Sequence, residues 1–152
     1  MHLAIYQPDI PQNTGTMLRL AACLGVTAHV IGPAAFAMSE RRLRRAGLDY
    51  LDALDLVLHD DFAGFEAWRV VDGKRLILLT TLAPAAYTAC AFRADDVLLV
   101  GRESAGVGED VHAAADAAVR VPMREGMRSL NVAVAAAMVL GEALRQTGGW
   151  KG

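Results

Sequence analysis

Residues 97–108 read VLLVGRESAGVG, and this stretch decides the class of fold. Its first four residues are all valine or leucine, which is typical of a buried strand in a parallel sheet. The glycine-rich loop that follows leads into a helical pattern over 108–115. A strand, a loop and a helix in this order form one unit of an α/β protein.

The same alternation runs along the whole chain. Strands are predicted over 2–6, 27–31, 56–58, 75–80 and 118–121, and helices over 14–24, 39–45, 62–68 and 129–146. This order predicts an α/β fold with a mainly parallel sheet and helices on both of its faces. Because the 152 residues contain no linker and no internal repeat, we expect a single domain over 1–152.

The last predicted helix is apolar on every face over 132–140. A helix of this kind has to be buried on all sides, and a domain of this length rarely encloses a helix completely. We therefore expect part of it to contact a second copy of the chain. The alternative is that its small alanines face solvent, since alanine is a good helix former.

Composition excludes several classes of protein. The formal charge of −2, from 15 Lys+Arg and 17 Asp+Glu, argues against a uniformly basic nucleic-acid-binding surface. No apolar run approaches the roughly 18 residues of a membrane span, and the N-terminus lacks the basic region of a signal peptide. Cys23 and Cys90 are far apart, which favours a reducing, cytoplasmic location. The four scattered histidines predict no metal site.

Four loops follow predicted strands, after residues 6, 80, 100 and 121, and are candidate ligand sites, because open α/β sheets bind ligands beyond the carboxyl ends of their strands. Three of these loops carry candidate residues. The loop 101–108 fails the dinucleotide pattern at Glu103 and lacks the lysine of a phosphate-binding loop. It therefore suits a ligand without phosphate or a cationic one. The alternative is a tight turn that exposes Glu103.

The other two loops carry polar residues next to helices. Ser129 is expected to cap the last helix, with Asn131 in its first turn, and with Arg128 these residues predict a lined cavity. In the loop after 2–6, Asn13 is a candidate helix cap, and Arg19 follows among apolar neighbours. The alternatives are plain capping and an arginine at the surface.

Four arginines cluster within 41–45 on a predicted helix. Such a face suits a phosphate backbone, and the alternative is an ordinary solvated face. The cluster comprises Arg41, Arg42, Arg44 and Arg45.

Taken together, the loops resemble the SPOUT class of RNA methyltransferases. The stretches NTGTMLR (13–19), GRESAG (101–106), and VPM (121–123) with SLN (129–131) look like its three motifs, in order. PDIPQNTG (8–15) and RLRRAGLDY (42–50) are similar to the small tRNA wobble-position 2′-O-methyltransferases of that class. The resemblance covers nearly the whole chain. The sequence departs from it at Arg102, where relatives often have proline, and at Gly141, where they often have tyrosine.

The resemblance implies a deep trefoil knot near the C-terminus and an obligate homodimer with its catalytic site at the interface. S-adenosylmethionine would bind in the knot and leave as S-adenosylhomocysteine, without a metal. Residues implied to hold it are Leu79, Gly101, Glu103, Val121, Met123, Ser129 and Leu130.

The implied reaction is methyl transfer to the ribose 2′-hydroxyl of the wobble nucleotide of tRNA, cytidine 34 or a modified uridine 34. Arg19, Ser129, Asn131, Glu103 and Asn13 match the catalytic positions. The cluster at 41–45 and Arg128 would bind the RNA.

Arg19 is unsuited to act as the base that removes the hydroxyl proton, because arginine stays protonated in proteins. We expect Arg19 to orient a phosphate and stabilise the developing alkoxide, while the proton leaves through Ser129 or water. Two alternatives stay open: the same fold acting on another tRNA position or on rRNA, and a dimer that binds S-adenosylmethionine without catalysis.

Overall fold

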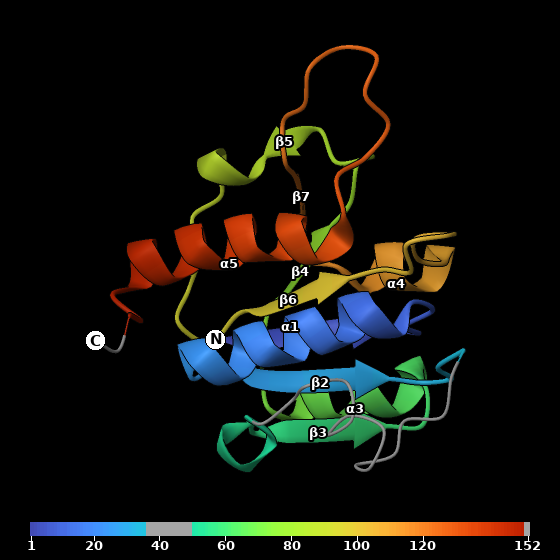
Figure 1. Ribbon diagram of the computed structural model, residues 1–152, viewed down its shortest axis with the longest axis vertical. Coiled ribbons are helices and arrows are strands. Elements are labelled where there is room, and N and C mark those ends of the chain that lie inside the picture. The colour runs from blue at the N-terminus through green and yellow to red at the C-terminus, as the bar shows by residue number, and fades with distance from the viewer. Residues whose placement is uncertain (36–49, 151–152) are drawn as a thin grey trace.

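A computed structural model describes residues 1–35 and 50–150, which form a single parallel sheet with helices on both faces (Figure 1). The strands are β1 (His2–Tyr6), β2 (Thr27–Ile31), β3 (Leu56–His59), β4 (Leu76–Leu79), β5 (Ala85–Ala86), β6 (Val97–Val100) and β7 (Ala117–Arg120). They lie in the order β3-β2-β1-β6-β4-β7-β5, and every pairing is parallel. The predicted α/β class is confirmed.

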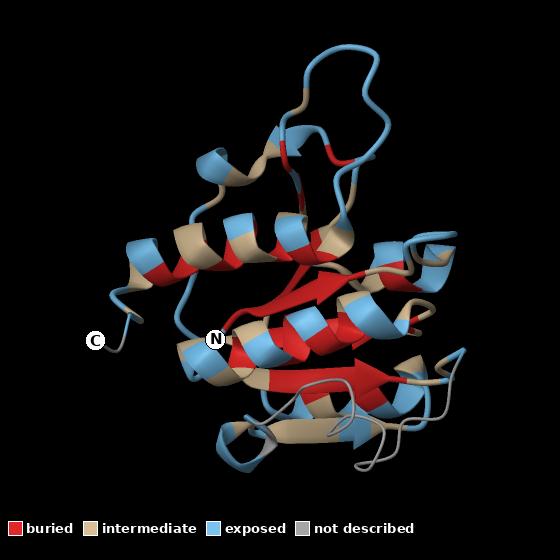
Figure 2. Ribbon diagram, in the orientation of Figure 1, coloured by how far each residue is buried: buried red, intermediate tan, exposed pale blue. Residues whose placement is uncertain are grey.

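Helices cover the sheet in two layers. The helices are α1 (Pro11–Leu24), α3 (Phe62–Val71), α4 (Glu109–Ala114) and α5 (Val132–Thr147), with 3-10 turns η1 (Leu51–Ala53) and η2 (Tyr87–Ala89). One apolar core joins the sheet to α1 and α5, and a second joins it to α3 and α4. Figure 2 shows the resulting pattern, with buried residues in the central strands and on the inner sides of the helices.

Helices α1 and α5 each begin three residues away from the predicted start. Helix α1 begins at Pro11 and not at Thr14, because proline needs no hydrogen-bond partner in the first turn and its φ suits a helix. Asn13 therefore lies inside the first turn and caps nothing. Helix α5 begins at Val132 and is capped by Asn131, so the prediction of Ser129 as the cap is wrong. The predicted helix over 39–45 lies outside the described residues.

The segment between β4 and β6 wraps around the C-terminal part of the chain. It leaves β4, pairs with the far side of β7 through β5, and returns to β6 on the other side of β4. It also holds α5, because the Gln146 side chain donates to the Cys90 carbonyl oxygen and accepts from Phe92 N, both at 3.0 Å. The expected trefoil knot requires this kind of interleaving. β5 itself has only two residues, too few to leave a pattern in the sequence.

Part of α5 stays exposed. Val134 and Met138, one turn apart, are 51% and 40% exposed, so full burial of this helix is not achieved within one chain. At Gly141 a Cβ atom would lie 3.9 Å from the Trp150 ring, so an aromatic side chain from the C-terminal segment occupies that side of α5. None of the described helices is long and apolar enough to cross a membrane.

Candidate active site

A pocket of about 190 Å³ opens at the carboxyl ends of β4, β6 and β7, where the sequence placed the candidate loops. All seven residues predicted to hold S-adenosylmethionine line it. Seven others were missed, although they lie in or beside the same loops: Thr80, Thr81, Arg102, Gly106, Val107, Val132 and Ala135. Position after a strand end was the signal that could have found most of them.

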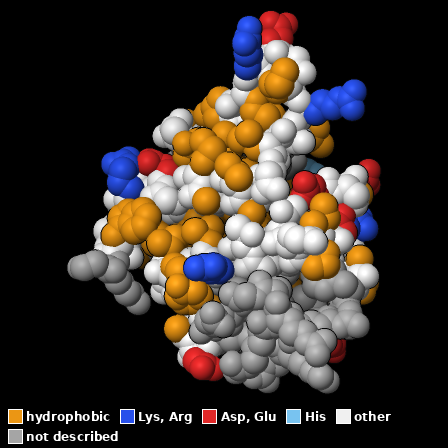
Figure 3. Space-filling model, viewed as in Figure 1, with side chains coloured by type: hydrophobic (Ala, Val, Ile, Leu, Met, Phe, Trp, Pro, Cys, Tyr) orange, Lys and Arg blue, Asp and Glu red, His pale blue; other side chains and the backbone are white. Residues whose placement is uncertain are grey.

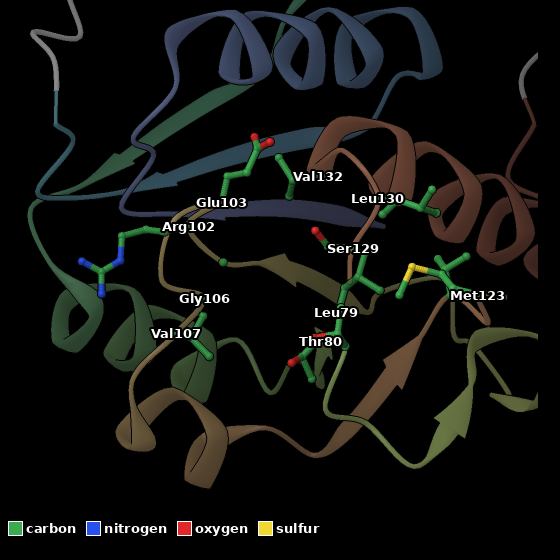
Figure 4. Close-up of a pocket in the computed structure, with 14 residues that line it drawn as sticks. Leu79, Thr80, Arg102, Glu103, Gly106, Val107, Met123, Ser129, Leu130 and Val132 are labelled. Carbon is green, nitrogen blue, oxygen red and sulfur yellow. The ribbon is translucent and has the colours of Figure 1, made fainter. Parts of the chain in front are cut away.

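The loop 101–107 forms one wall of this pocket (Figure 4). It is closed by two backbone bonds, Arg102 N to Gly106 O at 3.1 Å and Gly106 N to Arg102 O at 2.8 Å. Gly101 is required for this approach, since a Cβ there would lie 2.8 Å from the carbonyl carbon of Gly106. The guanidinium of Arg102 points away from the other labelled side chains (Figure 4).

Hydrogen bonds connect the three motifs at the mouth of the pocket. Asn13 on α1 donates to the Glu103 carboxylate, and Asn131 Nδ2 donates to Asn13 Oδ1 at 2.9 Å. Asn131 Oδ1 accepts from Ala133 N at 2.9 Å and so caps α5. The three side chains form one relay of hydrogen bonds, from the N-cap of α5 through α1 to the 101–107 loop.

Ser129 and Arg19 occupy different places. Ser129 lines the pocket. Arg19 is exposed on α1, with its guanidinium 4.8 Å above the Tyr50 ring and its Nη2 3.5 Å from the Tyr50 hydroxyl. Arg19 lies about 9 Å along the helix axis and about 120° around it from Asn13. The single chain therefore does not bring Arg19 into the relay.

The loop 122–130 carries exposed basic and apolar residues beside the pocket. Arg124 and Arg128 are exposed there, and Figure 3 shows Lys or Arg side chains projecting above α5. A second hollow, of about 400 Å³, lies between this loop and Thr81, and Arg120 also lines it. The predicted RNA-binding residues 41–45 lie outside the described part of the chain.

The site has the means to bind an uncharged or cationic ligand. Leucine, valine and methionine side chains line it together with hydroxyl side chains, one acid, Glu103, and one base, Arg102, whose guanidinium points away from the other labelled side chains. Among residues 1–35 and 50–150, no group of three or more His, Cys, Asp or Glu could hold a metal ion. The hydrogen bond from Asn13 holds the Glu103 carboxylate toward α1.

Comparison with known proteins connects this architecture to RNA methylation. Residues 1–141 match the SpoU rRNA Methylase family. A protein of Beijerinckia indica, named tRNA (cytidine(34)-2′-O)-methyltransferase, is 65% identical over 96% of this chain and 91% of its own length.

Two solved structures are similar in fold. One, described as giving structural insights into the 2-OH methylation of C/U34 on tRNA, has a TM-score of 0.88 and 43% identity, covering 95% of this chain and 94% of its own. The other is the SpoU methyltransferase AviRb of Streptomyces viridochromogenes in complex with the cofactor AdoMet. It has a TM-score of 0.85 and 28% identity, over 96% of this chain and 60% of its own.

Proposed function

The chain belongs to the SpoU rRNA methylase family, and from this we propose that it methylates the ribose 2′-hydroxyl of nucleotide 34 of tRNA. The methyl donor in this proposal is S-adenosylmethionine. The name and 65% identity of the Beijerinckia indica relative support the substrate. The observation that carries the proposal is that the second and third motifs line one pocket and that Asn13 of the first motif is hydrogen-bonded to both of them.

The residues that line the pocket support this donor. Gly101 lets the backbone approach a ligand closely, and Leu79, Val121 and Leu130 provide apolar walls for an adenine base. When bound, the donor supplies a methyl group carried on a sulfonium cation. Glu103 is the charge that such a cation favours, and it would repel a triphosphate at the same place.

The remaining residues act on the acceptor. The 2′-oxygen forms a bond to the methyl carbon as the carbon–sulfur bond breaks, and the hydroxyl proton has to leave. A ribose hydroxyl is a poor nucleophile until its proton is removed or shared. We assign proton transfer to Ser129 or a water beside it, and assign to Arg19 the stabilisation of the developing alkoxide and of a neighbouring phosphate.

The working unit in this proposal is a homodimer. Arg19 lies outside its own chain's relay, and Val134 and Met138 leave an apolar strip exposed on α5 (Figure 3). A second copy that covers this strip would bring Arg19 of one chain to the pocket of the other. Arg128 and the basic cluster at 41–45 would then bind the anticodon loop of the tRNA.

Nucleoside mass spectrometry of tRNA from a deletion strain and its parent tests the proposal. We expect the deletion strain to lose the 2′-O-methyl group at nucleotide 34, and the purified protein to restore it in the presence of S-adenosylmethionine. An unchanged tRNA profile with a lost rRNA methyl group would move the activity to rRNA. A protein that binds the donor but methylates neither RNA would be a binding dimer.

A further inference from the structure

The side chain of Asp9 makes an unusual set of contacts at the candidate site. It lies between β1 and α1, yet its carboxylate accepts three hydrogen bonds from the 101–107 loop. Glu103 N donates to Oδ1 at 3.2 Å, Ser104 N donates to Oδ2 at 3.0 Å, and the Ser104 hydroxyl also donates to Oδ2. The chemistry proposed above uses neither Asp9 nor Ser104.

These bonds reach the part of the loop that its own backbone leaves free. The backbone bridge joins Arg102 to Gly106 and closes the base of the turn. Residues 103 and 104 lie at its tip, where two successive N–H groups point to the same carboxylate. Hydrogen bonds to a charged acceptor are stronger than bonds between neutral groups. Asp9 therefore holds the tip in place from outside the loop.

The backbone on the other side of Asp9 is itself anchored. Gln7 N donates to the Ile31 carbonyl oxygen at 2.7 Å, and Ala35 N donates to the Pro8 carbonyl oxygen at 3.0 Å. Gln7 has a φ of 42°, an uncommon value for a residue with a side chain. Such strain persists only where the surrounding structure imposes it. The turn that presents Asp9 to the loop is thus built into the fold.

We propose that Asp9 is a positioning residue that holds the 101–107 wall of the pocket and the backbone of Glu103. Asn13 holds the Glu103 side chain, so the two residues together fix both ends of this acid. The proposal rests on the proposed function, because it assigns the same pocket to S-adenosylmethionine. Asp9 itself touches neither donor nor RNA in this scheme.

The charge of Asp9 persists under ordinary conditions. Partial burial raises the pKa of this carboxyl, but the hydrogen bonds from Ser104 and from the Glu103 backbone outweigh burial and leave the pKa below its usual value. The acceptor is therefore an anion across the neutral range.

Variants of Asp9 and Ser104 test the proposal in the full-length protein. In Asp9→Asn an NH2 group replaces one carboxylate oxygen. This group faces the donors of residues 103 and 104 and cannot accept their hydrogen bonds. We expect the dissociation constant for S-adenosylmethionine, measured by calorimetry without RNA, to rise about tenfold. We also expect the amides of 101–107 to exchange hydrogen faster. Ser104→Ala should weaken binding less, and Ser104→Thr, which keeps the hydroxyl, should restore it.

Asp9→Ala, which removes all three hydrogen bonds to the loop, is the second Asp9 variant, and Asp61→Ala is its matched control. Asp61 also accepts from a backbone N–H, that of Gly64 at 2.8 Å, but it caps α3 away from the pocket. We expect Asp61→Ala to lower the melting temperature and leave donor binding unchanged. Wild-type donor binding and wild-type loop exchange in both Asp9 variants would overturn the proposal. Failure of the proposed function would give a different result: the wild-type protein would bind the donor but would not methylate tRNA.

Discussion

Gly101 shows how one missing side chain permits the pocket. A Cβ at this position would lie 2.8 Å and 3.0 Å from two backbone atoms of Gly106 and 2.9 Å from Val107 Cγ1. Two of the three are backbone atoms that cannot rotate away. We expect Gly101→Ala to cost about 1–3 kcal/mol of unfolding free energy and to weaken binding of S-adenosylmethionine. Denaturant unfolding and calorimetry measure both effects.

Gly64→Ala is the control for this prediction. A Cβ at Gly64 would meet only Asp61 Oδ1, at 3.5 Å, which is an ordinary contact. Because alanine is the better helix former, this variant should be neutral or more stable by up to about 1 kcal/mol. If Gly101→Ala matched Gly64→Ala in both measurements, the close approach at Gly101 would not matter.

Arg19 makes a different kind of contribution, since it lies outside the pocket. Arg19→Lys keeps the positive charge but loses the planar fork of five donors. We expect kcat for tRNA to fall by about a hundredfold or more, and KM for S-adenosylmethionine to stay unchanged. Steady-state kinetics with each substrate varied in turn separates the two. Turnover close to wild type would show that Arg19 has no geometric role in catalysis.

At the scale of elements, one residue at the start of α5, Asn131, both caps the helix and binds α1. Asn131 caps the helix through Oδ1 and donates to Asn13 through Nδ2. Asn131→Asp keeps a capping oxygen but loses the donor, so the melting temperature should stay near wild type while kcat falls. Asn131→Ala should lose both, with a stability cost of about 1 kcal/mol. Thermal unfolding and a methylation assay on the same preparations compare them. Full activity in Asn131→Asp would show that the hydrogen bond from residue 131 to Asn13 is not needed for catalysis.

A chain of histidines across β1, β2 and β3 sets the response to acid. His2 Nδ1 lies 3.0 Å from His29 Nε2, and His29 Nδ1 lies 3.0 Å from His59 Nε2. Burial lowers the pKa of His2 to about 4 and, helped by repulsion from His2 and His59, that of His29 to about 3. Burial also lowers the pKa of His59. All three therefore favour the neutral form in the folded protein.

These shifts predict a loss of stability in acid. Above pH 6.5 the histidines are neutral in both states, so their contribution is complete there. As the pH falls from 6.5 toward 4 and then 3, the unfolded chain binds protons that the folded chain resists, and the unfolding free energy drops.

Unfolding midpoints between pH 7.5 and 4 should show this loss, and His2→Gln should reduce its slope. A matched His112→Gln change, at an exposed position on α4 outside the chain of histidines, should leave the slope as it is. A midpoint that stays constant across this range would contradict the prediction.

For the whole molecule, the exposed strip on α5 predicts the assembly. Val134 and Met138 lie one turn apart on a surface where a second copy would bury them. A glutamate at either position would have to lose its water at the interface with no opposite charge to pair with, which is costly. We expect the double change Val134→Glu and Met138→Glu to shift the protein to monomers in sedimentation and to abolish tRNA methylation.

Val71→Glu is the control, because Val71 is 86% exposed at the end of α3. It should change neither the mass in solution nor the activity. A double variant that stays dimeric would place the interface elsewhere.

Mixing two inactive variants tests whether each site uses both chains. A mixture of Arg19→Lys and Ser129→Ala chains should recover part of the activity if one chain supplies residue 19 and the other supplies residue 129.

Much of the fold and of the candidate site could be predicted from local patterns. The strands at 2–6, 27–31 and 97–100 follow from short apolar runs, and their parallel order follows from the helices between them. Position after a strand predicted the candidate loops, because the carboxyl ends of parallel strands share an edge of the sheet, whereas the resemblance to SPOUT methyltransferases supplied the seven donor-binding residues that line the pocket. These features depend on neighbours in sequence or on the general geometry of sheets.

Tertiary structure alone decided the rest. The contact of Asp9 with Ser104 joins residues 95 positions apart, and no periodicity records a contact of that kind. Asn131, not Ser129, caps α5, and its side chain also donates to Asn13, a long-range contact that no local pattern records. The two-residue strand β5 exists only because β7 lies beside it. Sequence alone determines which segments can form strands, helices and loops, whereas packing of distant segments determines which polar groups meet.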